Sequence, residues 1–283
     1  MSAPNETQPQ PAWLGWSGMT HRGKIRQNNE DAFLALTFDG LQPRFLGKTG
    51  EAALEGGDFV FAVSDGMGGA KCGEFASRVA VEKITRLLPA GYKLAAGGPS
   101  SRFDKLLSDL FAAIHRDLLS FGRSYPECAG MGTTLSLCWF TPLRLHFAHV
   151  GDSRIYHLPE KGHLRQLTHD HSHVGWLRRT GKLSELEARV HPHRNALSQA
   201  LGAGQQFVEP QIETLEWKRG DRFLICSDGV VEGLWDRRIE EVMEEKTPIQ
   251  SLAAALVTEA VNVSGGDNAT AVVVEVMPRP SSP

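Results

Sequence analysis

The sequence has no long hydrophobic run and no cluster of basic residues. No apolar stretch approaches the roughly 20 residues that a membrane helix needs. The first dozen residues are polar and rich in Pro and Gln, without the basic start and apolar stretch of a signal peptide. The 30 Lys and Arg residues and 33 Asp and Glu residues give a formal charge of -3, and no basic run marks a nucleic-acid site. We therefore expect a cytoplasmic protein that binds neither a membrane nor nucleic acid.

Cysteine is also scarce, with 4 residues in 283. These cysteines form no Cys-x-x-Cys pair and show no zinc-ligand spacing; they are Cys72, Cys128, Cys138 and Cys226. Disulfides are rare in reducing compartments. We therefore expect all four to be reduced thiols with structural roles.

The rest of the composition is that of an ordinary globular protein, with 41% hydrophobic and 22% charged residues. The length allows one large domain. The polar start predicts a flexible segment over residues 1–12, and the Pro- and Ser-rich end predicts a flexible tail over 278–283. Residues 13–277 are expected to form the folded domain.

Periodicity within this domain predicts strands and helices. Short apolar runs predict buried strands at 59–63, 134–140, 145–150, 222–226 and 269–276. Helical spacing predicts helices over 73–88, where Pro89 ends the pattern, over 103–121 and over 249–261. The Gly-rich segments 39–57 and 91–102 lack periodicity and are expected to be surface loops. Clustered strands with helices between the clusters favour sheet packed on sheet, with the helices outside.

Aspartates recur at the borders of the predicted strands; they are Asp65, Asp152, Asp228 and Asp267. A single Asp-Gly pair is commonest in an ordinary turn. Several carboxylates crowded at strand ends would raise one another's pKa unless a cation neutralised them. Ligands with only oxygen atoms favour Mg²⁺ or Mn²⁺, and two such ions promote phosphoryl displacement. The residues by themselves therefore predict a metal-dependent phosphoesterase.

The sequence around these aspartates carries 7 motifs in a characteristic order. They are Arg26-Gln-Asn-Asn-Glu30-Asp31, Asp65-Gly-Met-Gly-Gly69, Gly132-Thr-Thr134, Gly151-Asp-Ser-Arg154, Thr168-His-Asp-His-Ser172, Ser227-Asp-Gly229 and Asp267-Asn-Ala-Thr270. In this order they resemble the metal-dependent protein phosphatases of the PPM (type 2C) family, in its stand-alone bacterial form. The resemblance covers almost the whole folded domain. It implies an α+β fold, a four-layer αββα sandwich of two antiparallel sheets flanked by helices.

The resemblance also implies a metal centre at one end of the sandwich, with two Mn²⁺ or Mg²⁺ ions and a weaker third. By position, Asp65 would bridge the two ions and the Gly66 carbonyl would ligate one of them. Asp228 and Asp267 would complete the shell of the other ion, and Asp152 would join Asp228 at the third. Ligation through water would come from Glu30 and Asp31. Gly151 and Asn268 would not bind the ions but would hold the ligand residues in position.

Substrate binding is implied at two further places. Arg26 would grip the phosphate, a role that suits a planar guanidinium. Residues 171–195, with His171 and His193 near the two ends, resemble the family's flap, which influences substrate choice. The flap histidines, which also include His173 and His191, lack the Cys or carboxylate partners of a zinc site. For the flap arginines Arg178, Arg179 and Arg189, contact with acidic or phosphorylated substrate and a solvated helix face are both open.

The proton donor remains unassigned. Met67 stands where many eukaryotic members carry a His that is proposed as the general acid, although many bacterial members also have Met there. His149 precedes the Gly151-Asp152 motif, and we interpret it as a structural histidine.

The resemblance implies a monomeric phosphatase that removes phosphate from phosphoserine and phosphothreonine in proteins, by attack of a metal-activated water. It would oppose a bacterial Ser/Thr kinase of the eukaryotic-like type. Two alternatives are a catalytically dead fold that serves as a binding module and a hydrolase of another phosphoester. The intact set of Asp65, Asp228 and Asp267 argues against the first. The lack of a basic groove argues against a nucleic-acid substrate for the second.

Overall fold

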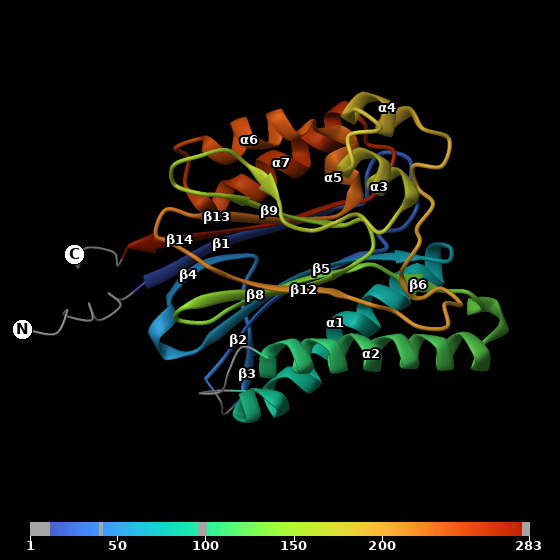
Figure 1. Cartoon of the computed structure of the whole chain (residues 1–283), viewed down its shortest axis with the longest axis horizontal. Coiled ribbons are helices and arrows are strands. Elements are labelled where there is room, and N and C mark those ends of the chain that lie inside the picture. Colours follow the sequence, from blue (N-terminus) through green and yellow to red (C-terminus); the bar gives the residue numbers. More distant parts are fainter. Residues whose placement is uncertain (1–11, 40–41, 96–100, 279–283) are drawn as a thin grey trace, which may run out of the picture.

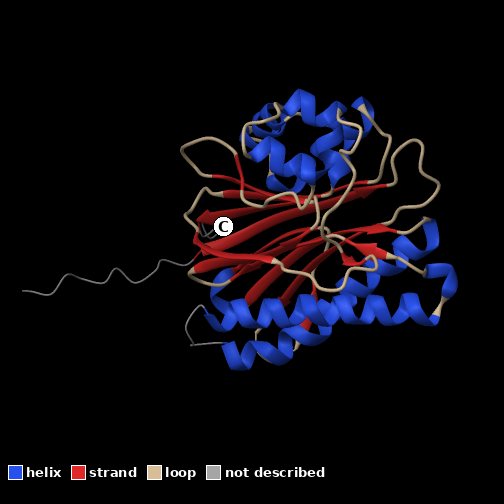
Figure 2. Cartoon of the chain, turned by 45° about the vertical axis from the view of Figure 1, so that its right-hand side comes forward, coloured by secondary structure: helices blue, strands red, loops and turns tan. Residues whose placement is uncertain are grey.

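Two β-sheets packed face to face, with helices on both outer sides, form the architecture (Figures 1 and 2). The computed structural model describes residues 12–39, 42–95 and 101–278. All strand pairs between named strands are antiparallel. The predicted α+β fold, an αββα sandwich, is therefore confirmed.

The first sheet has six strands. Their order is β10 (Arg165–Gln166), β9 (Arg154–Leu158), β13 (Arg222–Cys226), β14 (Ala269–Pro278), β1 (Ala12–His21) and β4 (Thr49–Ala53). The chain's first and last described strands lie side by side at its centre, since Ala12 pairs with Pro278 and His21 with Ala269.

The second sheet has eight strands. Its main path is β11 (Leu201–Gly202), β6 (Gly132–Thr133), β5 (Asp58–Met67), β7 (Leu135–Phe140), β8 (Arg144–Val150) and β12 (Gln211–Glu216). Strand β2 (Asp31–Phe38) pairs with β5 and with β3 (Pro43–Phe45). Strand β5 forms hydrogen-bonded pairs with β2, β6 and β7.

Helical layers cover the outer faces of both sheets (Figure 2). The second sheet packs against α1 (Ala70–Ala95) and α2 (Ser101–Ser124). The first packs against α5 (Asp228–Gly233) and α7 (Ile249–Val263), with α6 (Asp236–Glu244) beside α7. Two short helices, α3 (His173–Arg179) and α4 (Glu185–Val190), lie near α5 in the flap segment (Figure 1). Short 3₁₀ turns are η1 (Leu54–Gly56) and η2 (Pro126–Cys128).

Strand β5 shows why the predicted strands are continuously apolar. Val60 and Ala62 pack into the cluster under α1 and α2, whereas Phe59, Phe61 and Val63 face the other sheet. A strand between two layers is buried on both faces, so the usual alternation of polar and apolar residues disappears.

Several boundaries differ from the sequence predictions. The segment 39–57 is not only a loop, because it contains β3, β4 and η1; residues 40–41 lie outside the described part. Pro89 does not end α1, which runs to Ala95, because one missing backbone hydrogen bond does not end a helix whose apolar face is buried. Helices α1 and α2 thus occupy most of the expected loop 91–102, and residues 96–100 lie outside the described part.

The apolar patterns do not predict strands β1, β2, β9 and β12, because these strands mix polar and apolar residues.

The prediction of four reduced cysteines is wrong for one pair. Cys72 and Cys128, 56 residues apart in sequence, form a disulfide. The sequence separation hid this contact, because α1 and α2 pack together and return the chain to the start of α1. Cys138 and Cys226 are free and buried, and burial raises the pKa of the Cys226 thiol to about 12.

The chain ends are only partly described. Of the two expected flexible ends, residues 1–11 and 279–283 lie outside the described part, while Ala12 and Pro278 pair within the first sheet. None of the helices that the structure describes combines the length and the apolar character needed to cross a membrane.

Candidate active site

The aspartates singled out in the sequence come from strand ends of both sheets. Asp65 lies near the end of β5, and Asp31 opens β2 directly opposite Asp65 in the β2–β5 pairing. Asp228 follows β13 as the first residue of α5, and Asp267 precedes β14. Asp152 lies in the turn between β8 and β9. Packing of the two sheets therefore brings carboxylates that are up to 236 residues apart in sequence, as for Asp31 and Asp267, into electrostatic contact.

Burial and mutual repulsion disfavour the charged forms of these carboxyls. Desolvation raises the pKa of Asp65 well above its usual value, and the charges of Asp31, Asp228 and Asp152 raise it further. Desolvation and the neighbouring Asp152 and Asp267 act on Asp228 in the same way. Burial raises the pKa of Asp152 to about 7 and that of Asp31 to about 6. A bound cation would remove this repulsion.

Two carboxylate oxygens fit the requirement of a metal-ligand site. Oδ1 of Asp31 and Oδ1 of Asp228 are buried without a hydrogen-bond partner among the described residues. The other oxygen of Asp31 is held in place by Ser227 Oγ at 2.7 Å and Thr270 Oγ1 at 2.6 Å. Since buried carboxylates normally have partners, these oriented and unpaired oxygens suit a hard divalent cation.

The described residues do not yet form a compact ligand set. Among them, no group of three or more His, Cys, Asp and Glu side chains is gathered closely enough to hold an ion. One reason is visible at Asp267, whose Oδ2 accepts a hydrogen bond from Arg26 Nη2 at 2.6 Å. Another is the repulsion between the like charges.

The backbone of Asp65 is fixed by two threonines of the neighbouring strands. Thr133 Oγ1 donates to the Asp65 carbonyl at 2.7 Å, and Asp65 N donates to Thr134 Oγ1 at 3.0 Å. Gly66 then packs against the backbone of Gly73 and Glu30, so closely that a Cβ at this position would overlap the Gly73 carbonyl oxygen. The Asp65-Gly66 end of β5 is thus held from three sides.

Asn268 joins the segment that carries Arg26 to the start of β14. Its Oδ1 accepts a hydrogen bond from Glu30 N at 2.7 Å, and its Nδ2 donates to the carbonyls of Arg22 at 2.8 Å and Asn28 at 2.9 Å. The Asn268 backbone N–H donates to Asp267 Oδ1 at 2.7 Å. One side chain therefore positions Glu30 and the loop that carries Arg26.

The turn at Gly151 and Asp152 is held by two histidines. His171 Nδ1 accepts a hydrogen bond from Gly151 N at 3.2 Å. His149 contacts Ser136 Oγ at 2.8 Å and the Gly151 carbonyl at 3.0 Å. Burial lowers the pKa of His149 to about 3, so it is neutral at pH 7. These contacts agree with its interpretation as a structural histidine.

Two flap arginines have partners inside the protein. Arg178 pairs with Asp236 of α6. Arg189 bonds Glu185 at 3.2 Å and the carbonyls of Glu232 and Leu234, and its guanidinium lies over the Trp235 ring. Both side chains are largely buried, so a solvated helix face does not describe them; they fasten the flap to α5 and α6 and also line the adjoining cleft. Arg179 is exposed.

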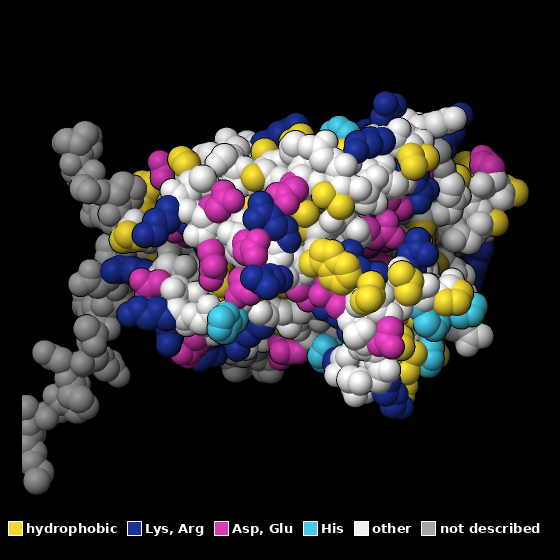
Figure 3. Space-filling view, turned by 90° about the horizontal axis from the view of Figure 1, so that it is seen from above, with side chains coloured by type: hydrophobic (Ala, Val, Ile, Leu, Met, Phe, Trp, Pro, Cys, Tyr) yellow, Lys and Arg dark blue, Asp and Glu magenta, His cyan; other side chains and the backbone are white. Residues whose placement is uncertain are grey.

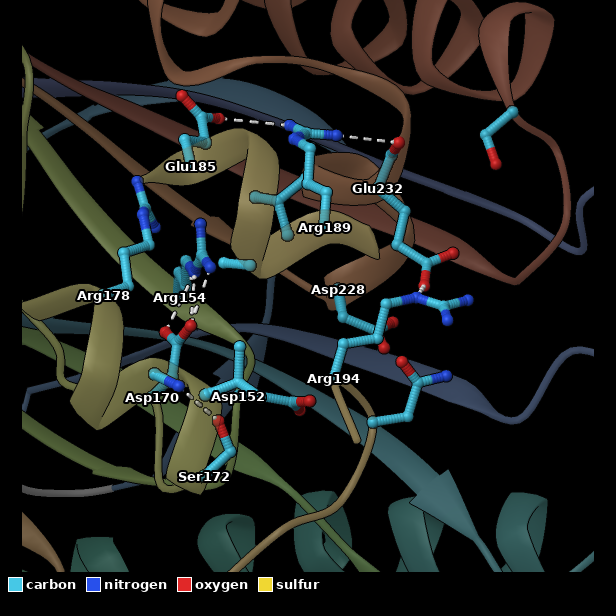
Figure 4. A pocket seen from close by; sticks show the side chains of 16 residues that line it. Asp152, Arg154, Asp170, Ser172, Arg178, Glu185, Arg189, Arg194, Asp228 and Glu232 are labelled. Carbon is cyan, nitrogen blue, oxygen red and sulfur yellow. Dashed lines mark hydrogen bonds and ion pairs between the residues drawn. The ribbon is translucent and has the colours of Figure 1, made fainter. Parts of the chain in front are cut away.

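A cleft of about 280 Å³ lies between the flap and α5. Asp152 and Asp228 line it together with Arg194 of the flap, which forms an ion pair with Glu232 at 3.8 Å (Figure 4). The cleft wall also contains Arg154, which grips Asp170 through two parallel hydrogen bonds of 2.9 and 2.6 Å. On the outer surface, hydrophobic and histidine side chains gather at the end of the molecule that carries the flap (Figure 3).

Comparison with known proteins decides the family. The family model described as Protein phosphatase 2C matches residues 48–262. The chain belongs to this family. Over 257 residues, which cover 90% of the chain and 93% of the relative, it is 33% identical to the serine/threonine phosphatase stp of Listeria monocytogenes. The family places the chain among the metal-dependent protein phosphatases.

Solved phosphatases share the fold. The serine/threonine phosphatase of S. agalactiae superposes with a TM-score of 0.78 at 28% identity, covering 93% of this chain and 99% of the other. The catalytic domain of the phosphatase PstP in complex with 2 manganese ions gives a TM-score of 0.73 at 29% identity, covering 94% and 99%. The family thus supports dependence on Mn²⁺ or Mg²⁺, which suits the carboxylate oxygens of the candidate site.

Sequence reasoning missed several residues that shape the phosphatase site. Ser227 and Thr270 orient Asp31, although both belong to the quoted motifs. The pair Arg154 and Asp170 also lies within two motifs, but only the fold shows that their side chains meet. The available sequence signal was a Ser or Thr close to a motif aspartate. The sequence did not show that these hydroxyl groups would bond Asp31.

Proposed function

We propose that this protein removes phosphate from phosphoserine and phosphothreonine in proteins at a centre of two Mn²⁺ or Mg²⁺ ions. The observation that carries this proposal is the convergence of Asp65, Asp228 and Asp267 from the ends of both sheets, with Arg26 beside Asp267. The fold, the family and the names of the relatives support it.

The ligand roles proposed here are those that the family resemblance implies. Asp65 and the Gly66 carbonyl would hold the ions on the β5 side, and Asp228 and Asp267 would hold them on the side of the first sheet. Glu30 and Asp31 would act through water. Asp152, which raises the pKa of Asp228 and lines the cleft beside it, would complete a third and weaker site with Asp228.

Arg26 would bind the phosphate group. Its side chain is 49% exposed, and one guanidinium nitrogen already contacts Asp267, so it lies within one side-chain length of the metal ligands. When bound, the two ions supply a Lewis acid for the phosphate and an activated water as the nucleophile. The guanidinium would orient the phosphate toward that nucleophile with two parallel hydrogen bonds.

The proton for the leaving serine or threonine oxygen does not come from Met67, which has no titratable group. His149 is a poor candidate, because both its ring nitrogens are engaged in the turn at Gly151.

We further propose that the enzyme is a cytoplasmic monomer whose substrates are made by a bacterial Ser/Thr kinase of the eukaryotic-like type.

A phosphothreonine peptide tests the proposal. Purified protein should release phosphate only with Mn²⁺ or Mg²⁺, and Asp228→Ala should lower the rate by roughly 100-fold or more. A dead phosphatase fold would leave the peptide intact under all conditions. Equal rates with EDTA, or an unchanged rate in Asp228→Ala, would exclude the proposed centre.

A further inference from the structure

The disulfide between Cys72 and Cys128 lies beside the end of β5 that carries Asp65. It joins the first turn of α1, which follows β5, to the end of η2, which precedes β6. Gly66 pairs with Thr133, and Met67 with Gly132, so backbone pairing joins the same two segments a second time only a few residues away. Gly68 and Gly69 lie between these two connections, directly after the Asp65-Gly66 end of β5.

On one side, the disulfide holds the first turn of α1. Cys72 N donates to the Gly69 carbonyl at 2.9 Å, and Cys72 directly precedes Gly73. Gly73 packs against the Gly66 backbone and the Glu30 side chain without room for a Cβ. A shift of Cys72 would therefore reach Gly66 and Glu30 through a single close-packed residue.

On the other side, it holds the chain that leads to Thr133. Met131 N donates to the Cys128 carbonyl at 3.0 Å, and the Met131 backbone lies against Gly68. Thr133 and Thr134 then fix the Asp65 backbone. Both cysteines are thus connected to the same Asp65-Gly66 end of β5 by short, packed segments.

The two sulfur atoms differ in their surroundings. Cys72 is 7% exposed, whereas Cys128 is only half-buried and lies between the exposed residues Glu127 and Ala129. Attack by an external thiolate is therefore directed at the Cys128 sulfur. The Cys72 thiolate then leaves at the N-terminus of α1, next to the exposed Lys71, where negative charge is favourable.

We propose that Cys72–Cys128 is a redox modification site that dithiol reductants open, and that its opening loosens the Asp65–Gly73 segment and weakens divalent-cation binding. The first thiolate of the reductant bonds to the Cys128 sulfur as the S–S bond breaks and Cys72 leaves with the electron pair. The second thiol of the reductant displaces Cys128 from the mixed disulfide. The reductant ends as a disulfide, both cysteines end as thiols, and two electrons are transferred.

Thiol counting first establishes the two forms. With an aromatic disulfide reagent in denaturant, the oxidised protein should show two thiols, from Cys138 and Cys226, because only these are free. After reduction with dithiothreitol and anaerobic desalting, it should show all four cysteines of the sequence. Four thiols in protein purified and kept in air would overturn the proposal.

Amide hydrogen exchange of the metal-free protein then tests the coupling without any phosphatase assay. Reduction should speed exchange in residues 65–73 by about tenfold or more, while the central strand β14 stays unchanged. Calorimetric titration with Mn²⁺ should give a dissociation constant about fivefold or more higher for the reduced form. Equal exchange and equal Mn²⁺ affinity in both forms would refute the coupling.

The variant Cys72→Ser/Cys128→Ser provides the matched control. It should behave like the reduced form in both measurements and should not respond to dithiothreitol. A response in this variant would show that the reductant acts elsewhere and would overturn the assignment. The metal effect rests on the proposed function, but the two can fail separately. Phosphatase activity with equal Mn²⁺ affinity in both forms refutes only the coupling between the disulfide and cation binding. The exchange result stands even if the protein hydrolyses no phosphopeptide.

Discussion

Arg26 Nη2 donates a hydrogen bond of 2.6 Å to Oδ2 of Asp267, 241 residues later in the chain. The hydrogen bond joins the proposed phosphate-binding residue to a proposed metal ligand. The Asp267 side chain is 23% exposed and that of Arg26 49%, so the pair lies at the mouth of the site rather than in its interior. Binding of a cation by Asp267 would compete with this pair and free the guanidinium for phosphate.

Replacement of Arg26 tests its role in substrate binding. Arg26→Ala should raise KM for a phosphothreonine peptide by roughly 10- to 100-fold, the loss expected for hydrogen bonds to a charged group, with a smaller change in kcat. Steady-state kinetics at saturating Mn²⁺ measures both constants. Arg86→Ala, which removes an exposed arginine paired with Glu82 on α1, should change neither. A large fall in kcat at constant KM would contradict ground-state phosphate binding.

Replacement of Asp65 should separate activity from stability. Asp65→Asn keeps the shape but removes one of the crowded charges, so the metal-free protein should become more stable by about 1 kcal/mol or more. Activity should fall roughly 100-fold or more, and Mn²⁺ should no longer raise the melting temperature as it does in the wild type. Thermal unfolding with Mn²⁺ and with EDTA checks this. Asp109→Asn, an exposed aspartate paired with Lys105, is the control; a less stable Asp65→Asn protein in EDTA would be evidence against charge crowding.

Asp58 should make stability depend on pH. It is buried and accepts a hydrogen bond from Trp139 Nε1 at 2.7 Å, and desolvation raises its pKa to about 7. Between about pH 4 and 7 the folded protein therefore holds a proton that the unfolded chain has lost, so the free energy of unfolding falls as pH rises. The total change is at most about 4 kcal/mol for this shift.

The variant Asp58→Asn isolates this contribution, since Asn can still accept the Trp139 hydrogen bond but does not titrate. Urea unfolding at pH 5 and pH 8 should show a smaller loss of stability for the variant than for the wild type. The carboxylates of the active site contribute equally to both proteins and cancel in the difference. Parallel pH dependences would show that Asp58 titrates normally.

Arg189 should determine how firmly the flap is attached. Arg189→Met keeps the aliphatic stem but loses the bonds to Glu185 and to the carbonyls of Glu232 and Leu234. Local opening of residues 173–190 should become easier by about 2 kcal/mol, or roughly 30-fold in amide exchange. Arg179→Met, in the same flap but exposed, should leave exchange unchanged. Equal exchange in both variants would mean that other contacts hold the flap.

The proposed ligands could be singled out from the sequence because they lie in short local motifs. Asp65 and Asp228 each follow an apolar strand and precede Gly, a pattern visible within six or seven residues. The continuously apolar strands likewise indicated burial on both faces. Strands such as β1 and β12 were missed, because their sequences mix polar and apolar residues and their identity depends on the partner strand.

The sequence by itself determined which residues could bind a hard cation and in which strand-end turns they stand, because turn chemistry and hydrophobic patterning act over a few residues. Only the tertiary structure decided which side chains meet. The pairing of Arg26 with Asp267, the attachment of Arg189 to the start of α6, and the bond between Cys72 and Cys128 each join distant segments. Such contacts depend on how the sheets and helices pack, and no local pattern encodes them.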